Sequence, residues 1–137
     1  MDTLRITRDD LDADGVYTKA ESIDYAGHVE VDAGLGTVRI RGSLRATGRI
    51  RCMAGSGIKA GEGIKAGWGI EAGSGIEAGW GIEAGLSIIA RFLSVRLRVF
   101  AGVVSWRLPQ PSECEVRAEI RSGTLAHGTH VAPTVKS

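Results

Sequence analysis

The hydrophobic positions in the middle of this chain recur every six residues. From Ala54 to Ala90 the sequence repeats an Ala-Gly-x-Gly-Ile-Lys/Glu hexad. A six-residue period does not match the 3.6 residues of a helical turn, and each glycine costs a helix about 1 kcal/mol relative to alanine. In a strand, Ile70 and Ala72 lie on one side and Glu71 on the other. The pattern therefore predicts short strands whose isoleucines form one buried set: Ile58, Ile64, Ile70, Ile76, Ile82 and Ile88.

A short fixed period is typical of a solenoid, in which each unit buries its apolar residues against its neighbours. We therefore predict an all-β fold, a single-domain β-solenoid of short hexad strands. The paired glycines are expected to supply the unusual backbone dihedrals of tight corners. A disordered glycine-rich linker is the alternative, but such linkers usually lack a strictly placed β-branched residue.

The six-residue spacing extends upstream of the glycine-rich hexads. Ile40, Ala46 and Cys52 form a column that runs into Ile58, so the solenoid is expected to begin well before Ala54, near Leu11. We expect one solenoid domain over residues 1–121, with regular hexads at 54–90, and a polar tail over 122–137.

After Ala90 the pattern becomes less regular. Val95, Leu97 and Val99 alternate with two arginines, which predicts a strand, and a further alternating strand is predicted over residues 115–121. We interpret residues 91–107 as wider terminal coils or a cap, because an open solenoid end is a template for unwanted strand pairing.

The number of hexads in one coil is left open between three and two. With eighteen residues per coil, Lys59 stacks on Glu77 and Lys65 on Glu83. With twelve, the aromatic residues spaced twelve apart would stack instead. Exposed ion pairs contribute only about 0.2–1 kcal/mol, so neither clue decides, and eighteen is our expectation.

The net charge of +1 implies no global electrostatic partner, but the charges are segregated along the chain. Residues 1–35 hold nine acidic side chains and three basic ones, whereas residues 36–54 hold five arginines and no acid. These arginines are candidate phosphate or nucleic-acid contacts, and a solvated strand face is the alternative. No aromatic residue interleaves them to stack bases, so nucleic-acid contact is expected to be minor. The five are Arg39, Arg41, Arg45, Arg49 and Arg51.

The remaining composition favours a soluble cytoplasmic protein. Cys52 and Cys114 are too few and too far apart in sequence to argue for a disulfide framework. The first residues lack an apolar signal core, and no apolar run approaches membrane-spanning length.

One stretch matches the calcium-loop pattern D-x-D-x-D-G-x5-E, through Asp10, Asp12, Asp14 and Glu21. Its flanks are poor helices, and residues 9–15 also align with residues 42–48 as x-x-Leu-x-Ala-x-Gly, which would be one coil segment. The second interpretation fits better, so no specific calcium site is expected.

Two tryptophans are the strongest candidates for binding. Trp68 and Trp80 occupy a hexad position that elsewhere holds serine, glutamate or leucine, so it is not expected to be dry core. Glycines flank both rings. The alternatives are local packing against those glycines and a pair of protein-binding anchors, and Arg96 and Arg98 are candidate supporting charges.

No nucleophile motif, phosphate loop, dinucleotide fingerprint or zinc spacing is present. The period resembles that of hexapeptide acyltransferases, which normally carry a small residue two positions before the aliphatic one. Here that position includes Glu62 and two tryptophans. We therefore expect no enzyme activity, no cofactor and no metal.

The Gly-x-Gly-Ile-(Lys/Glu)-Ala-Gly array over residues 50–102 resembles glycine-rich hexad proteins of bacteriophages and prophages. More remotely it is similar to bactofilin-type polymer-forming β-helices. The phage resemblance implies a small cytoplasmic protein of the bacterial host cell that binds a host protein or nucleoprotein complex, including an inhibitor of a defence such as CRISPR. A self-associating structural solenoid, joined through its ends, is the second expectation.

Overall fold

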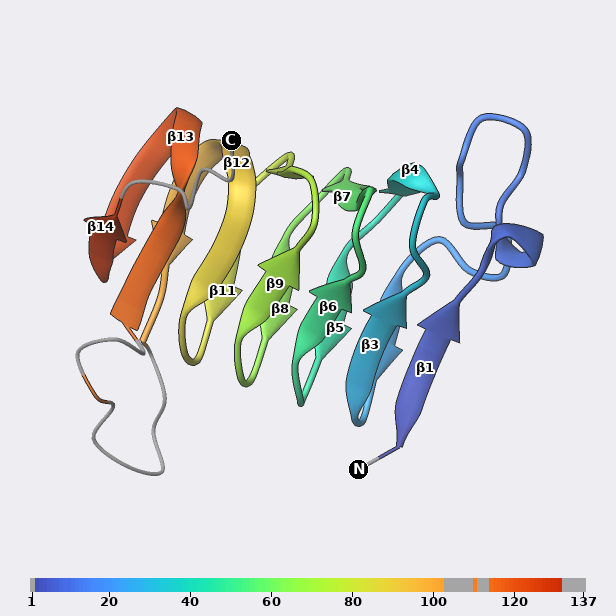
Figure 1. Cartoon of the computed structure of the whole chain (residues 1–137), viewed down its shortest axis with the longest axis horizontal. Coiled ribbons are helices and arrows are strands. Elements are labelled where there is room, and N and C mark those ends of the chain that lie inside the picture. Colours follow the sequence, from blue (N-terminus) through green and yellow to red (C-terminus); the bar gives the residue numbers. More distant parts are fainter. Residues whose placement is uncertain (1, 103–109, 111–113, 132–137) are drawn as a thin grey trace.

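The computed structural model describes residues 2–102, 110 and 114–131, and these form a β-solenoid. Successive coils stack along the long axis of the molecule from the N-terminal end (Figure 1). Neighbouring strands from different coils pair in parallel. The predicted all-β solenoid is therefore confirmed.

Each regular coil contributes one strand to each of three faces, which we name after their most regular strands. The β9 face contains β1 (Thr3–Ile6), β3 (His28–Val31), β6 (Ile50–Cys52) and β9 (Ile70–Ala72). The β10 face contains β4 (Gly36–Ile40), β7 (Ser56–Ala60) and β10 (Ile76–Ala78). The β11 face contains β2 (Ile23–Tyr25), β5 (Leu44–Ala46), β8 (Ile64–Ala66) and β11 (Ile82–Ala84).

The C-terminal strands are longer and cross from face to face. β12 (Ile88–Phe100) pairs with β9, β10 and β11 in turn, so this one strand crosses all three faces. β13 (Glu115–His127) pairs with β12, and β14 (Thr129–Val131) pairs with the start of β13.

The strand register answers the question of coil length. Ile58 pairs with Ile76 and Ile64 with Ile82, eighteen residues later in each case. Both predicted ion pairs form across these strands, at 3.7 Å for Lys59–Glu77 and 3.3 Å for Lys65–Glu83. The twelve-residue coil is wrong. In an eighteen-residue coil, a spacing of twelve residues puts Trp68 and Trp80 at different corners.

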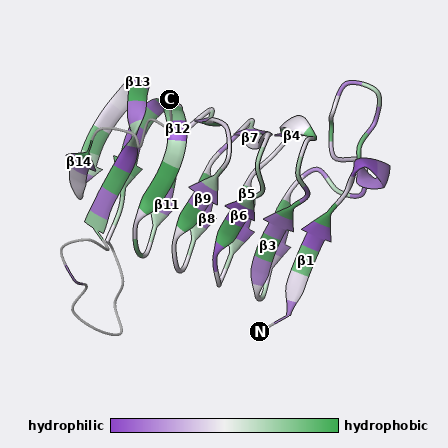
Figure 2. Ribbon diagram, viewed as in Figure 1, coloured by the Kyte–Doolittle hydropathy of each residue, from purple (hydrophilic) through white to green (hydrophobic). Residues whose placement is uncertain are grey.

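The core is a column of aliphatic side chains inside the three faces. None of the six hexad isoleucines is more than 2% exposed, and the alanine two residues after each is also buried. Figure 2 shows hydrophobic residues in the strands of the middle coils, whereas the short helix near the N-terminus is hydrophilic. The predicted buried set is therefore confirmed.

The hexad glycines are required for a different reason from the one expected. Of the glycines in the repeat, only Gly55 has a positive φ. Instead, a Cβ added at Gly61 would lie 2.2 Å from the carbonyl oxygen of Arg41, and one at Gly79 would lie 2.0 Å from that of Gly61. These glycines let the backbones of successive coils approach closely at the corners.

The N-terminal end departs from the sequence-based expectation. The solenoid begins with β1 at Thr3 and not near Leu11. The alignment of residues 9–15 with a coil segment is wrong, because Leu11 bridges to Tyr17 while the strand partner of Leu44 is Ile23. Residues 7–22, which include a 3-10 helix η1 (Arg8–Asp10), form an excursion that seats the buried ring of Tyr17 against the core.

The C-terminal part also differs. β13 continues through Ser122 to His127 and pairs with β12, so this stretch is strand and not tail. His127 Nδ1 lies 2.6 Å from the carbonyl oxygen of Ala101 and donates to it, which ties the end of β13 to the coil before it. Residues 103–107 of the expected cap and residues 132–137 of the expected tail lie outside the described residues.

Candidate functional site

The two candidate tryptophans lie at different corners of the solenoid. Because one coil is three hexads, the tryptophan position alternates among three corner columns. At one corner, the backbone N–H of Trp68 donates to Gly48 O and its backbone carbonyl accepts from the N–H of Leu86. At another, the backbone N–H of Trp80 donates to Glu62 O and its carbonyl accepts from the N–H of Leu97. The pair therefore does not form one continuous face.

The third corner column shows that the hexad position is not uniformly exposed. Ser56 is completely buried, and its hydroxyl accepts the Leu35 N–H at 3.1 Å and donates to the carbonyl of Asp32. A serine at this position is therefore not evidence of a solvent-facing corner. Each tryptophan has to be assessed in its own surroundings.

Trp80 is the exposed member of the pair. The residue is 58% exposed, and Leu97, which follows it in the next coil, is 61% exposed. The flanking glycines are fixed by coil stacking, because a Cβ at Gly79 or Gly81 would collide with the backbone of a neighbouring coil. Trp80 therefore projects from a backbone that is held on both sides.

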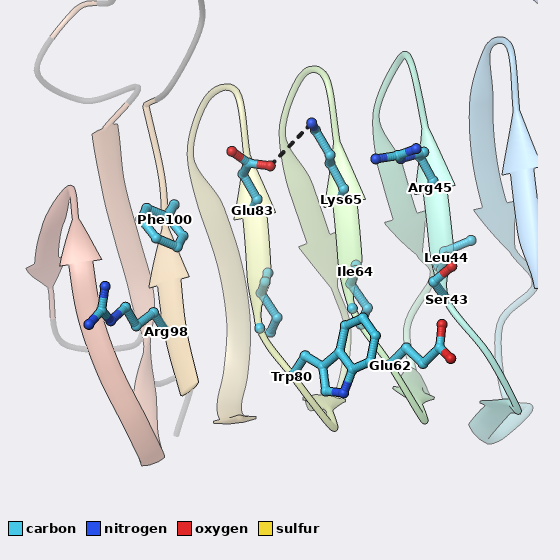
Figure 3. Close-up of a pocket in the computed structure, with 13 residues that line it drawn as sticks. Ser43, Leu44, Arg45, Glu62, Ile64, Lys65, Trp80, Glu83, Arg98 and Phe100 are labelled. Carbon is cyan, nitrogen blue, oxygen red and sulfur yellow. Dashed lines mark ion pairs between the residues drawn. The ribbon is translucent and has the colours of Figure 1, made fainter. Parts of the chain in front are cut away.

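A groove of about 430 Å³ lies beside Trp80 on the β11 face. In Figure 3 the indole extends toward Ile64 and Glu62, and Phe100 stands on the far side of Glu83. The outward residues of the face follow one another in register: Arg45 opposite Lys65, Lys65 opposite Glu83, and Glu83 opposite Phe100. The groove thus combines two aromatic rings with a row of charged groups, and we call it the Trp80 groove.

The charges in the Trp80 groove are unevenly compensated. Lys65 pairs with Glu83 inside the groove, as the dashed line in Figure 3 marks. Arg45 and Arg98 are both exposed, and neither makes an ion pair with any described residue. Two guanidinium groups at opposite ends of the groove are therefore available to a ligand.

Trp68 is half-buried and has structural partners. Its ring meets His28 edge-on with centroids 5.1 Å apart, and the Arg49 guanidinium carbon lies 5.9 Å from the ring centroid. The Arg49 backbone N–H donates to His28 Nδ1 at 2.9 Å, so neutral His28 carries its proton on Nε2. These contacts indicate local packing, the alternative raised for both tryptophans.

The arginines of residues 36–54 encircle one coil instead of lining one face. Arg39 lies on the β10 face, Arg45 on the β11 face and Arg51 on the β9 face, with Arg41 and Arg49 at corners. Arg51 stands between Glu30 and Glu71 in its row. Only Arg45 of the five reaches the Trp80 groove.

The other pair of candidate arginines is divided as well. Arg98 lines the Trp80 groove, whereas Arg96 lines a separate depression beside Ser94 and Ser122. With Leu97 they form three consecutive exposed residues, so the alternation predicted for Val95–Val99 is interrupted where the chain turns a corner.

Asp10 and Asp12, two of the residues that match the calcium-loop pattern, bind different partners. Asp10 is 7% exposed, pairs with Lys19 at 2.8 Å and accepts the Thr7 N–H at 2.8 Å. Hydrogen bonding to Lys19 and Thr7 holds the pKa of Asp10 below its ordinary value. Asp12 instead accepts the backbone N–H groups of Asp14 and Val16. The expectation of no calcium binding stays a prediction.

Of the other reactive groups, Cys52 is a buried free thiol and Cys114 a partly exposed one. Burial raises the pKa of the Cys52 thiol to about 12, so it carries no thiolate near neutral pH. His130 Nε2 lies 2.6 Å from the carbonyl of Ala118. Within the described ranges, no group of three or more His, Cys, Asp or Glu side chains could hold a metal ion. No helix in that part of the chain is long and apolar enough to cross a membrane.

Sequence reasoning missed three members of the Trp80 groove and its rim. Leu97 looked like an inward strand residue, Phe100 like part of a cap, and Arg45 like part of an arginine stripe. These residues lie together because the step from β11 to the part of β12 stacked on it is seventeen residues instead of eighteen, as the pairing of Ile82 with Val99 shows. The only available signal was the loss of the hexad after Ala90.

Comparison of the chain with family models, with curated proteins and with solved structures finds no match. A proposal of function therefore rests on the geometry of the Trp80 groove.

Proposed function

We propose that this chain is a non-enzymatic binding module that docks on a host protein or nucleoprotein complex through the Trp80 groove. The carrying observation is a tryptophan 58% exposed on a backbone fixed by close coil stacking. Trp80 is not an isolated exposed residue, because Leu97 follows it in the next coil and is 61% exposed, and contiguous exposed apolar side chains are typical of interaction sites.

The composition of the groove is that of an interface centre and its rim. Tryptophan and arginine are enriched among the residues whose truncation costs most in binding. The indole has few rotatable bonds and the β-frame is already ordered, so little conformational entropy is lost on docking. Leu97 and Phe100 extend the apolar area around Trp80, and the charged side chains surround it.

The test compares the two tryptophans as matched single variants. Trp80→Ser is expected to weaken partner binding about thirtyfold, which corresponds to a truncation cost of about 2 kcal/mol. Its melting temperature should stay within a few degrees of the parent. Trp68→Ser should bind normally but melt earlier, because it loses the contacts with His28 and Arg49.

The measurement uses tagged parent and variants to capture partners from a bacterial host lysate, followed by titration of the purified partner. Thermal unfolding by circular dichroism supplies the stability values. A Trp80→Ser protein that remains folded and binds as tightly as the parent would place the binding face elsewhere. The arginines that encircle the β4–β6 coil would then be the next candidates.

The resemblance to phage hexad proteins supports a narrower form of the proposal, an inhibitor of a bacterial defence of the CRISPR type. A plaque assay tests this form. Expressing the parent should restore plaques of a targeted phage on a host with active CRISPR immunity, and Trp80→Ser should restore far fewer. Equal plaque counts with and without the parent would reject the anti-defence role for that system while leaving the binding module intact.

Self-association is the second candidate function. Among the described strands, β1 and β2 toward the N-terminal end and β14 at the C-terminal end each pair with only one other strand, so each presents an unpaired edge. Such an edge can pair with another chain. Sedimentation measured over a hundredfold concentration range distinguishes the two functions, because a binding module keeps one size and an assembling solenoid does not.

A further inference from the structure

The Trp80 groove has two cationic ends and an aromatic middle. Arg45 extends from β5, and Arg98 lies at the corner leading to the end of β12. Between them lie the strands β8 and β11, with the Trp80 ring beside Ile64, whereas Phe100 stands on β12 at the Arg98 end (Figure 3). A ligand that contacts both arginines must therefore pass Trp80 and end close to Phe100.

The spacing of the strands that carry the two arginines sets the length of such a ligand. β5, β8, β11 and β12 are consecutive in the sheet, so Arg45 and Arg98 are three strand spacings apart. At about 4.8 Å per spacing this is about 14 Å along the solenoid axis. Four residues of an extended peptide span about 13 Å, so anionic side chains four residues apart would reach both arginines.

Carboxylates fit these two positions better than a nucleic-acid backbone does. A nucleic acid carries a negative charge on every nucleotide, and the phosphates between the two ends would pass the carboxylates of Glu62 and Glu83. A peptide can leave its middle uncharged and place charge only at the ends. The guanidinium fork can bind the two oxygens of a carboxylate or of a phosphate, so the spacing of the charges decides between the two ligands.

We infer that the Trp80 groove receives an extended acidic segment of a protein, with two carboxylate side chains four residues apart and an apolar or aromatic side chain between them. Arg45 and Arg98 bind the carboxylates, and the middle side chain packs against Trp80. This inference rests on the proposed function and adds the chemistry of the partner.

Two pools of fluorescent nonapeptides test the inference. In the first pool two glutamates are fixed four positions apart, phenylalanine is fixed midway between them, and the other positions are random. The matched pool replaces both glutamates by glutamine. A third probe is a nine-nucleotide deoxythymidine strand. Binding to the full chain is measured by fluorescence anisotropy at low and at physiological salt.

The glutamate pool is expected to bind at least tenfold more tightly than the glutamine pool, and more weakly as salt increases. Arg45→Gln and Arg98→Gln should each weaken it about tenfold. The matched control Arg91→Gln removes the same charge at another corner, where the Arg91 N–H donates to Ser74 O, and should leave binding unchanged.

Each other outcome overturns the inference in a distinguishable way. If both peptide pools bind equally and only Trp80→Ser weakens them, the docking site stands and the acidic partner is wrong. If the deoxythymidine strand binds more tightly than the glutamate pool, the ligand is nucleic acid. If Trp80→Ser still captures the lysate partner normally, the proposed function fails together with the inference. If no probe binds while lysate capture still depends on Trp80, the four-residue acidic pattern is rejected.

Discussion

The corner glycines offer the sharpest test of how the coils are held together. Gly79 lies directly before Trp80, and a Cβ built on it would be 2.0 Å from the carbonyl oxygen of Gly61 in the preceding coil. Real Cβ atoms essentially never approach closer than 3.0 Å, so Gly79→Ala must open this corner by at least about 1.0 Å. The obstructing atom belongs to the backbone and has no rotamer through which to move away.

The cost can be worked out from the contacts that such an opening stretches. The Gly79 N–H donates to Ala60 O at 2.9 Å, and the Trp80 N–H donates to Glu62 O at 3.2 Å. Overpacking a close contact costs about 1–3 kcal/mol, and weakening one hydrogen bond adds about 0.5–1.5 kcal/mol. Replacing glycine by alanine stabilises the folded state by about 0.4–1 kcal/mol, because alanine reduces the conformational entropy of the unfolded chain. We expect a net loss of about 0.5–4 kcal/mol in the free energy of unfolding.

Gly63 provides a matched control within the same repeat. Its added Cβ would lie 3.6 Å from Gly81 O, an ordinary contact distance. Gly63→Ala is therefore expected to be neutral or stabilising by up to about 1 kcal/mol. Urea unfolding followed by far-UV circular dichroism measures both variants. If Gly79→Ala unfolds at the same urea concentration as Gly63→Ala, close backbone stacking is not what requires these glycines.

The remaining predictions concern the core and the N-terminal excursion. Ile70 is 2% exposed, so Ile70→Ala should lower the free energy of unfolding by about 2–5 kcal/mol. Glu71→Ala, on the outer side of the same strand, should change the urea midpoint little. Equal midpoints for the two variants would contradict the buried column. The lowered pKa of Asp10 means that its contribution to stability is present above the unfolded value of about 3.9 and is lost as the pH falls through the lower folded pKa. The parent should therefore lose more stability than Asp10→Asn between pH 6 and pH 2, and parallel pH profiles would show that the Lys19 pair is not coupled to folding.

The regular coils could be predicted from sequence because each hexad repeats the same local information. Ile58, Ile64 and Ile70 report one buried position three times, and the change from Lys59 to Glu77 indicates which coil stacks on which. The eighteen-residue coil follows from such complementary charges, although each exposed pair contributes little free energy. Redundancy in the sequence, and not the strength of any contact, made this part predictable.

The irregular coils could not be predicted because their partners depend on the length of each turn. Leu44 pairs with Ile64, which is twenty residues later, and with Ile23, which is twenty-one residues earlier. A shift of one residue in register moves an inward side chain to the outside. The local similarity of residues 9–15 to a coil segment therefore had no structural meaning. The reason for glycine at the corners was also hidden, because collision with the next coil is a long-range contact.

The composition of the Trp80 groove follows from one shortened coil. Had the eighteen-residue step continued from β11, Arg98 would follow Trp80 at the corner and Ala101 would follow Glu83 on the face. The seventeen-residue step instead places Leu97 after Trp80 and Phe100 opposite Glu83. An apolar corner and a second aromatic ring are thereby added to the groove, while Arg98 moves beside them. The hexads supply a rigid frame, and the change from an eighteen-residue to a seventeen-residue step gives this part of the outer surface a composition that the regular coils do not have.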